Sequence, residues 1–153
     1  MCVRSSELPE PFRGDLDGLN LYLKPGLEPE ETLFLLVHLF GHTVQWNVSA
    51  RARELGAVAP PVPPGLLPEL EAYEQEACRY GLGLLHLEGV FELDQWLTDL
   101  AACDFLYLRH FYVTGQRRPV ESFWRSGLPC LTPLMIPPFR PVRWKARSVG
   151  IVL

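Results

Sequence analysis

Cysteine is scarce in this chain and shows no metal-binding or disulfide pattern. None of the four cysteines forms a CxxC pair with another, which argues against both a zinc ribbon and a disulfide framework. We interpret all four as free thiols, and they are Cys2, Cys78, Cys103 and Cys130.

Long apolar runs are also missing. The longest one, Leu33 to Val37, stops at His38 and is far too short to span a bilayer. The N-terminus lacks the basic and then apolar pattern of a secretory signal. We therefore expect a cytoplasmic protein that does not enter a membrane.

An excess of positive charge is absent as well. The net charge of −4 at pH 7 gives the chain no general attraction for nucleic acid or anionic lipid. Basic residues gather only near the C-terminal end, where we interpret Arg140, Arg143, Lys145 and Arg147 as a solvated tail. We expect no direct binding of nucleic acid.

What is present describes an ordinary globular chain. Its 153 residues are 48% apolar and 21% charged, which is the balance of a folded protein rather than a disordered one. This length is enough for one domain with a core of its own.

The first third of the chain predicts an arm, a strand and a helix. Residues 1–16 are polar and punctuated by proline, so we expect a flexible N-terminal arm. Leucine at every second position over residues 19–23 indicates a half-buried strand. Pro29, followed by two glutamates, begins a helix that should end near residue 46. The apolar middle of this helix places it in the interior.

Two further helices are expected after a linker. Five prolines between residues 57 and 68 indicate a loop that crosses the surface. Apolar residues at helical spacing then predict helices over residues 67–87 and 92–112. Beyond them we expect a short helix over residues 120–125 and a strand over residues 149–153.

The expected fold class is α+β, mainly helical with a small β-sheet. Residues 17–118 should form the main domain. Residues 119–153 should form a proline-rich C-terminal extension packed on that domain, because their prolines forbid ordinary helices.

The main functional pattern is the histidine pair His38 and His42 in the first predicted helix. One helical turn separates them, so both imidazoles project from the same face and can close on one metal ion. This is the spacing of a zinc-peptidase helix, whose usual motif is His-Glu-x-x-His with the Glu as general base. Here Leu39 takes the place of that Glu. The pattern predicts a metal site without the residue that normally makes it cleave peptides.

A third ligand is expected from the second predicted helix, because two histidines alone hold zinc weakly. This helix resembles the second motif of the ImmA/IrrE family of zinc-dependent metallopeptidases, and the matching residues are Glu74, Glu76, Ala77, Tyr80, Gly81, Leu84 and Leu85. The acidic helix start, the apolar run and the histidine pair are similar to the first motif of that family. The resemblance covers residues 19–87, about half of the chain.

The resemblance implies a zincin-like fold and a zinc ion held by His38, His42 and Glu74. Glu76 should face elsewhere, because it lies two residues further along the helix. Cys78 stands where such enzymes often place a polar partner for a metal-bound histidine. The family cleaves helix-turn-helix repressors, so the resemblance implies a DNA-binding regulator as partner, although no helix-turn-helix segment is evident in this chain.

Three functions remain open. The first is a degenerate zincin-like metallopeptidase, or pseudoenzyme, that serves as a metal-binding regulatory or binding module. The second is an active zinc-dependent metallohydrolase in which another residue replaces the general base. The third is a structural interaction protein without metal, whose proline-rich C-terminus docks onto the domain or onto a second copy in a homodimer.

The sequence offers two candidates for the missing base or for an oxyanion donor, His110 and Tyr112 near the end of the third predicted helix. Simple packing is the competing interpretation of both. Glu31 lies about 10 Å from the first histidine by helical rise, too far to act directly. Gln45 and Val48 exclude the metzincin pattern.

The aromatic residues allow one more interpretation. Several of them could line a ligand groove, but aromatic side chains at this density more often fill a core. The residues concerned are Trp96, Phe105, Tyr107, Phe111, Phe123, Trp124 and Trp144.

Overall fold

The computed structural model describes residues 1–9 and 12–144, and over these residues the fold is α+β and about 53% helical. Three strands and four α-helices follow one another with two 3₁₀ turns. In chain order they are β1 (Cys2–Ser5), β2 (Gly14–Leu16), β3 (Asn20–Leu23), α1 (Pro29–Val48), α2 (Ala50–Leu55), η1 (Pro64–Leu66), α3 (Leu67–Leu87), α4 (Asp94–Thr114) and η2 (Val120–Phe123).

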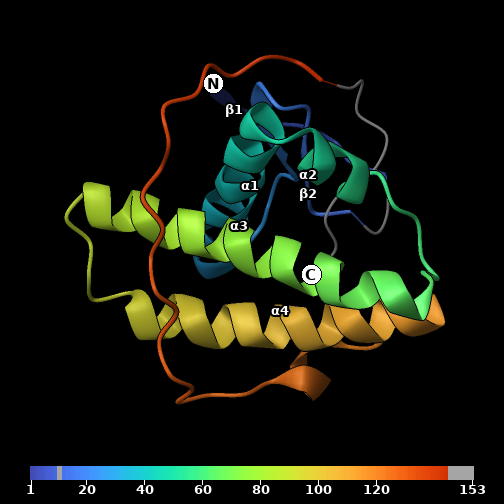
Figure 1. Cartoon of the computed structure of the whole chain (residues 1–153). Coiled ribbons are helices and arrows are strands. Elements are labelled where there is room, and N and C mark those ends of the chain that lie inside the picture. The colour runs from blue at the N-terminus through green and yellow to red at the C-terminus, as the bar shows by residue number, and fades with distance from the viewer. Residues whose placement is uncertain (10–11, 145–153) are drawn as a thin grey trace.

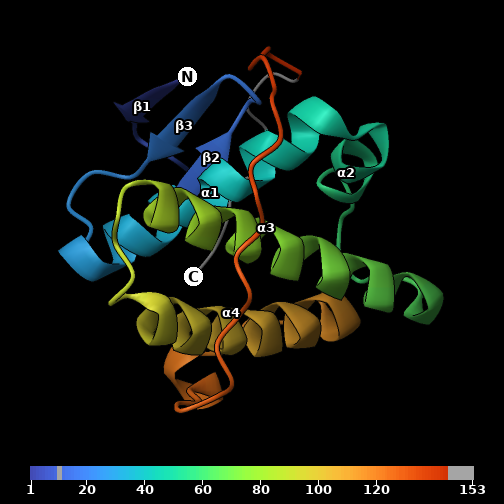
Figure 2. The same cartoon turned by 60° about the vertical axis from the view of Figure 1, so that its left-hand side comes forward.

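The elements form successive layers. Figure 2 shows the sheet on one side of α1 and helix α3 on the other, and α4 packs against the far side of α3. One apolar cluster joins the sheet to α1, and a second joins α1, α3 and α4. Helix α1 is therefore interior, as its apolar middle predicted.

The sheet has the order β1-β3-β2, with β1 parallel and β2 antiparallel to the central strand. Leu21 and Leu23 of β3 are buried, which confirms the strand that the alternating leucines predicted. Gly18 has a φ of +90° in the turn between β2 and β3. A β-carbon there would press on the side chain of Trp144, so both the backbone and the space require glycine.

The N-terminal segment differs from the arm that the sequence predicted. Residues 2–5 form β1 and residues 14–16 form β2. All four residues of β1 are exposed, so the strand carries no alternating apolar signal, and β2 is only three residues long. Both strands exist because β3 offers them backbone partners, which a local pattern cannot reveal.

The long helices follow the prediction, with shifts at their ends. Helix α1 continues two residues beyond the expected end, and α3 spans residues 67–87 as predicted. Helix α4 begins and ends two residues later than expected, and its C-cap is Gly115 at a φ of +67°. Helix α2, capped by the side chain of Ser49, was not predicted. The expected helix over residues 120–125 is a 3₁₀ turn, and the expected strand over residues 149–153 lies outside the described residues.

The chain after α4 returns across the helices as an extended strap, residues 128–144, drawn in orange and red in Figure 1. It is tied to α3 where the Leu134 amide donates to the Arg79 carbonyl and the Arg79 side chain donates to the Thr132 carbonyl. At its far end the Trp144 amide donates to the carbonyl of Asp17. The strap thereby connects α3 to the sheet.

Helices α1 and α3 approach each other closely at two glycines. A β-carbon at Gly41 would overlap the carbonyl of Ala77, and one at Gly81 would press on the carbonyl of Val37. The two backbones therefore touch at these glycines, and their side chains meet on either side of the crossing. No helix within the described residues has the combined length and apolar character that a bilayer span requires.

Candidate metal centre

The two histidines of α1 and Glu74 of α3 meet beside the helix crossing. Nε2 of His42 lies 3.0 Å from Nε2 of His38 and 3.0 Å from Oε2 of Glu74. Nε2 of His38 lies 3.3 Å from the same carboxylate oxygen. The structure thus brings together the three ligands named from the sequence, with one donor atom of each within 4.8 Å of the others.

Burial and mutual contact set the charge of these groups. His38, His42 and Glu74 are all buried. Burial lowers the pKa of His38, and neighbouring His42 lowers it further, which favours a neutral imidazole. Burial by itself would raise the pKa of Glu74, but contact with the two histidines holds it below its ordinary value. A neutral imidazole and an ionised carboxylate are the forms that bind a metal.

Gln45 fixes the orientation of the His42 ring. Its amide nitrogen donates to the Tyr73 carbonyl at 2.8 Å and to Oε2 of Glu76 at 2.7 Å. The amide oxygen therefore faces Nδ1 of His42, 2.9 Å away, and this nitrogen must carry the proton. Nε2 of a neutral His42 is then left with its lone pair toward the centre. Glu76 faces away from the triad, as predicted, yet it holds Gln45 in place.

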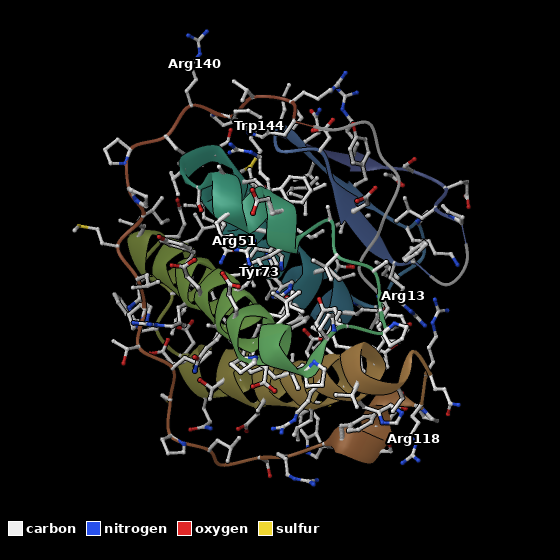
Figure 3. All side chains as sticks on the ribbon, turned by 45° about the vertical axis from the view of Figure 1, so that its right-hand side comes forward. Arg13, Arg51, Tyr73, Arg118, Arg140 and Trp144 are labelled. Carbon is white, nitrogen blue, oxygen red and sulfur yellow. The ribbon has the colours of Figure 1, made fainter. Side chains whose placement is uncertain are left out.

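Tyr73 covers the other side of the His42 ring. The two ring centroids are 4.5 Å apart, and the Tyr73 hydroxyl accepts a hydrogen bond of 2.9 Å from the indole of Trp46. Figure 3 labels Tyr73 among the interior side chains near α2 and α3. The ring of His42 is thus held by packing as well as by Gln45.

His38 has a thiol as its outer partner, by which we mean the group in contact with Nδ1. Its Nδ1 lies 3.1 Å from Sγ of Cys78, and Phe34 stacks on the ring with centroids 5.5 Å apart. Burial raises the pKa of the Cys78 thiol, and Asp104 and then Glu74 raise it further, so the sulfur stays protonated. A neutral thiol is a weaker acceptor than the carboxylate or carbonyl that usually holds a metal-bound histidine.

Leu39, at the position of the absent general base, lies in the apolar core. Its side chain is fully buried in the cluster that joins α1 to the sheet, and it approaches Gly14 of β2. Glu31 is paired with Arg13 at 2.7 Å, and the other glutamate of the helix start, Glu30, accepts from a tryptophan indole. No glutamate of α1 therefore replaces the base.

Of the two residues that the sequence offered as catalytic candidates, one contacts the triad and the other does not. Tyr112 donates from its hydroxyl to Oε1 of Glu74 at 3.0 Å, so it belongs to the site. Burial and the charge of Glu74 raise the pKa of Tyr112, which keeps the phenol protonated. His110 lies on another face of α4, next to Thr114 and Phe123, and does not reach the triad.

A cleft of about 200 Å³ opens beside the triad. His42, Glu74 and Tyr112 line it from the helices, and Asp15 lines it from β2, one of the two edge strands among the described residues. Sequence reasoning missed Asp15 because β2 was assigned to the arm. The cleft gives a small ligand or an extended peptide access to one side of the centre.

Asp104 of α4 is a second acidic residue that sequence reasoning missed. It is 1% exposed, and neither carboxylate oxygen has a hydrogen-bond partner among the described residues. Burial, and then the charge of Glu74, raise its pKa well above the ordinary value. A signal did exist in the sequence, because Asp104 continues the buried face of α4 that carries Leu97 and Ala101.

The donor set is chemically suited to a divalent metal. Two imidazole nitrogens and one carboxylate oxygen are the protein ligands of zinc peptidases, and the same set also binds iron. The geometry therefore supports a metal ion of this class without selecting zinc.

Comparisons of this chain with models of known families, with curated proteins and with solved structures found no match.

Proposed function

We propose that this protein is a zincin-like metal-binding protein, similar in its site to the ImmA/IrrE peptidases, that works as a regulatory or binding module. The observation that carries the proposal is the buried contact of His38, His42 and Glu74, combined with an apolar residue at the base position. We take zinc as the metal, because this ligand set is typical of zinc peptidases. Under this proposal the protein is a degenerate metallopeptidase.

The residues around the triad have separate tasks in this proposal. His38, His42 and Glu74 hold the ion, and a bound zinc supplies a Lewis acid that makes a water molecule more acidic. Gln45 holds the His42 tautomer, and Tyr112 orients the second oxygen of Glu74. Because residue 39 is a leucine, no carboxylate stands there to accept a proton from the water. The absence of this base should lower the rate of hydrolysis by a factor on the order of 10²–10⁴.

The partner in this proposal is a protein. The resemblance favours a helix-turn-helix regulator, and the cleft beside the triad, bordered by the edge strand β2, offers a place for an extended segment of it. A second copy of this chain is the other partner that we propose.

Metal analysis of the purified protein tests the central claim. After loading with zinc and dialysis, we expect close to one equivalent in the parent protein and in His86→Ala, because His86 contacts Asp94 outside the site. We expect His42→Ala to lose the metal while retaining its helical circular dichroism. Absence of bound metal from the folded parent would overturn the proposal in favour of a structural interaction role.

A second candidate function rests on the cleft. Asp15 and Tyr112 line it together with His42 and Glu74, so a carboxylate and a phenol stand beside the metal ligands. In this alternative the protein is an active metallohydrolase, with Asp15 as base. Chelator-sensitive cleavage of an unfolded test peptide by the parent, lost in both His38→Ala and Asp15→Asn, would favour it over the first proposal.

A further inference from the structure

The two histidines differ in the groups that contact Nδ1 of each ring. Nδ1 of His42 donates to Gln45, and Gln45 donates onward to the carboxylate of Glu76. This chain runs from histidine through a neutral side chain to an acid. Nδ1 of His38 meets the neutral side chain of Cys78, but no acid of residues 1–9 or 12–144 is hydrogen-bonded behind it. The chain that begins at His38 therefore lacks the terminal carboxylate that Glu76 supplies to the chain from His42.

Asp104 is a buried carboxylate on the face of α4 that packs with Cys78. Cys78 packs in one cluster with Ala101 of α4, and Asp104 follows Ala101 by three residues on the same helix face. Apart from burial, the Asp104 charge has the largest effect on the Cys78 thiol, larger than that of Glu74. Asp104 also acts electrostatically on Tyr112, which binds Glu74. The groups that feel its charge thus include members of the metal centre.

Its lack of a partner calls for an explanation. A buried carboxyl group with no hydrogen bond costs free energy, and native proteins contain few such groups outside functional sites. Asp104 also borders a cleft of about 530 Å³ between α1 and α4, but both of its oxygens are buried. The oxygens are covered from that cleft as they stand, so we look for their partner among the groups packed around them.

We propose that Asp104 is a positioning residue of the metal centre, the terminal carboxylate of a chain that runs from His38 through Cys78. In the metal-bound arrangement that we propose, His38 donates from Nδ1 to the sulfur, and the Cys78 thiol, which makes no hydrogen bond to Asp104 in the structure, donates its proton to that carboxylate. Accepting the thiol proton makes the sulfur a better acceptor for His38, which holds the ring with Nε2 toward the metal. The inference rests on the proposed metal binding, because it assigns the residue a role toward the ion.

Charge balance supports the same role. A divalent ion brings two positive charges into the interior, and Glu74 is the only acidic ligand of the triad. An ionised Asp104 beside Cys78 would supply a second negative charge without occupying a ligand position. Burial and the charge of Glu74 raise the pKa of Asp104 well above its ordinary value, which makes its charged form costly until a positive charge lies nearby.

Zinc affinity, measured by competition with a chelator at pH 7, tests the role directly. We expect Asp104→Asn to bind zinc about tenfold more weakly than the parent, the lower end of the range for outer partners of metal ligands. The matched control is Asp99→Asn, because Asp99 is a buried carboxylate on the same helix that caps the amides of Gly127 and Leu128. We expect this control to bind zinc as the parent does, even if it is less stable.

A double-mutant cycle shows whether Asp104 acts through Cys78. Cys78→Ala should weaken zinc binding by a similar factor, and adding Asp104→Asn to it should have little further effect. Cys78→Ser should retain most of the affinity, because a hydroxyl can also accept from His38 and donate to Asp104. Additive losses in the cycle would overturn the proposed chain.

The melting temperature separates a positioning role from a structural one. Without metal, Asp104→Asn should melt no lower than the parent, because the native carboxyl has no partner to lose. With zinc, its rise in melting temperature should be smaller than that of the parent. Equal zinc affinity in the parent and Asp104→Asn would overturn the inference alone, whereas a folded parent that binds no zinc would overturn the proposed function and the inference with it.

Discussion

At the scale of single residues, the proposed function depends on Leu39. We expect Leu39→Glu to gain chelator-sensitive cleavage of an unfolded test peptide over the parent, because a carboxylate next to His38 restores the base. We also expect a lower melting temperature, because the new carboxylate enters the apolar cluster beside Gly14. The measurement is peptide cleavage with and without chelator, together with a thermal melt.

The matched control for this change is Leu39→Gln, whose side chain has the size of Glu but carries no charge and cannot serve as a base. It should also be destabilised, because its amide enters the same apolar cluster, and it should show no gain in cleavage. If both variants fold, bind zinc and remain equally inactive, the loss of the base is not what separates this protein from a peptidase.

The residues of the triad were predictable from the sequence, and their surroundings were not. His38 and His42 share one face of one helix, so their spacing alone is enough to pair them. Glu74 came only from the resemblance to a known motif. The surroundings of Gln45 and Asp104 depend on how α1, α3 and α4 cross. Local sequence patterns do not predict how helices cross.

At the scale of elements, the contact between α1 and α3 determines whether the ligands meet. We expect Gly41→Ala to destabilise the protein by about 2 kcal/mol and to weaken metal binding, because the new methyl group overlaps the carbonyl of Ala77. Alanine has the better helix propensity by about 1 kcal/mol, so a net loss identifies the helix contact as the cause. Urea unfolding and zinc affinity are the measurements.

Gly65→Ala is the control for this substitution, because no atom lies within 4 Å of a β-carbon built there. It should leave both stability and zinc affinity close to those of the parent. A Gly41→Ala variant as stable as the parent would show that the two helices can separate without loss.

The elements themselves were predicted in proportion to the strength of their local signals. Helices α1, α3 and α4 are each about 20 residues long, with apolar spacing and recognisable ends, and they lie within two residues of the expected positions. β1 and β2 were assigned to an arm, because an exposed strand and a three-residue strand owe their structure to β3. Helix α2 is six residues long and gave no periodic signal.

At the scale of the whole molecule, Asp17, in the turn between β2 and β3, joins the sheet to the C-terminal end of the described chain. Its carboxylate accepts from the amides of Leu19 and Asn20 at 2.9 and 2.7 Å, and from the Arg143 side chain at 2.9 Å. The last of these bonds joins residues 126 positions apart. The strap that crosses α3 is therefore anchored to the turn of the sheet, and the stability of this anchor is a property of the fold as a whole.

The charge of Asp17 makes a specific prediction for acid unfolding. Burial alone would raise the pKa of Asp17, but hydrogen bonds from Asn20, Leu19 and Tyr22 outweigh burial and lower its pKa from 3.8 to about 2. A pKa that is lower in the folded state contributes stability above the pKa of the unfolded state. This contribution should therefore be present above pH 4 and be lost as the pH falls toward 2.

Asp17→Asn should be less stable than the parent at pH 6 by on the order of 2 kcal/mol, because its amide has one accepting oxygen where the carboxylate has two. The difference should shrink between pH 4 and 2, measured by urea unfolding at each pH, whereas Glu88→Gln, at an exposed surface position, should show no such change. A difference between the parent and Asp17→Asn that stays constant over this range would show that the charge of Asp17 does not stabilise this turn.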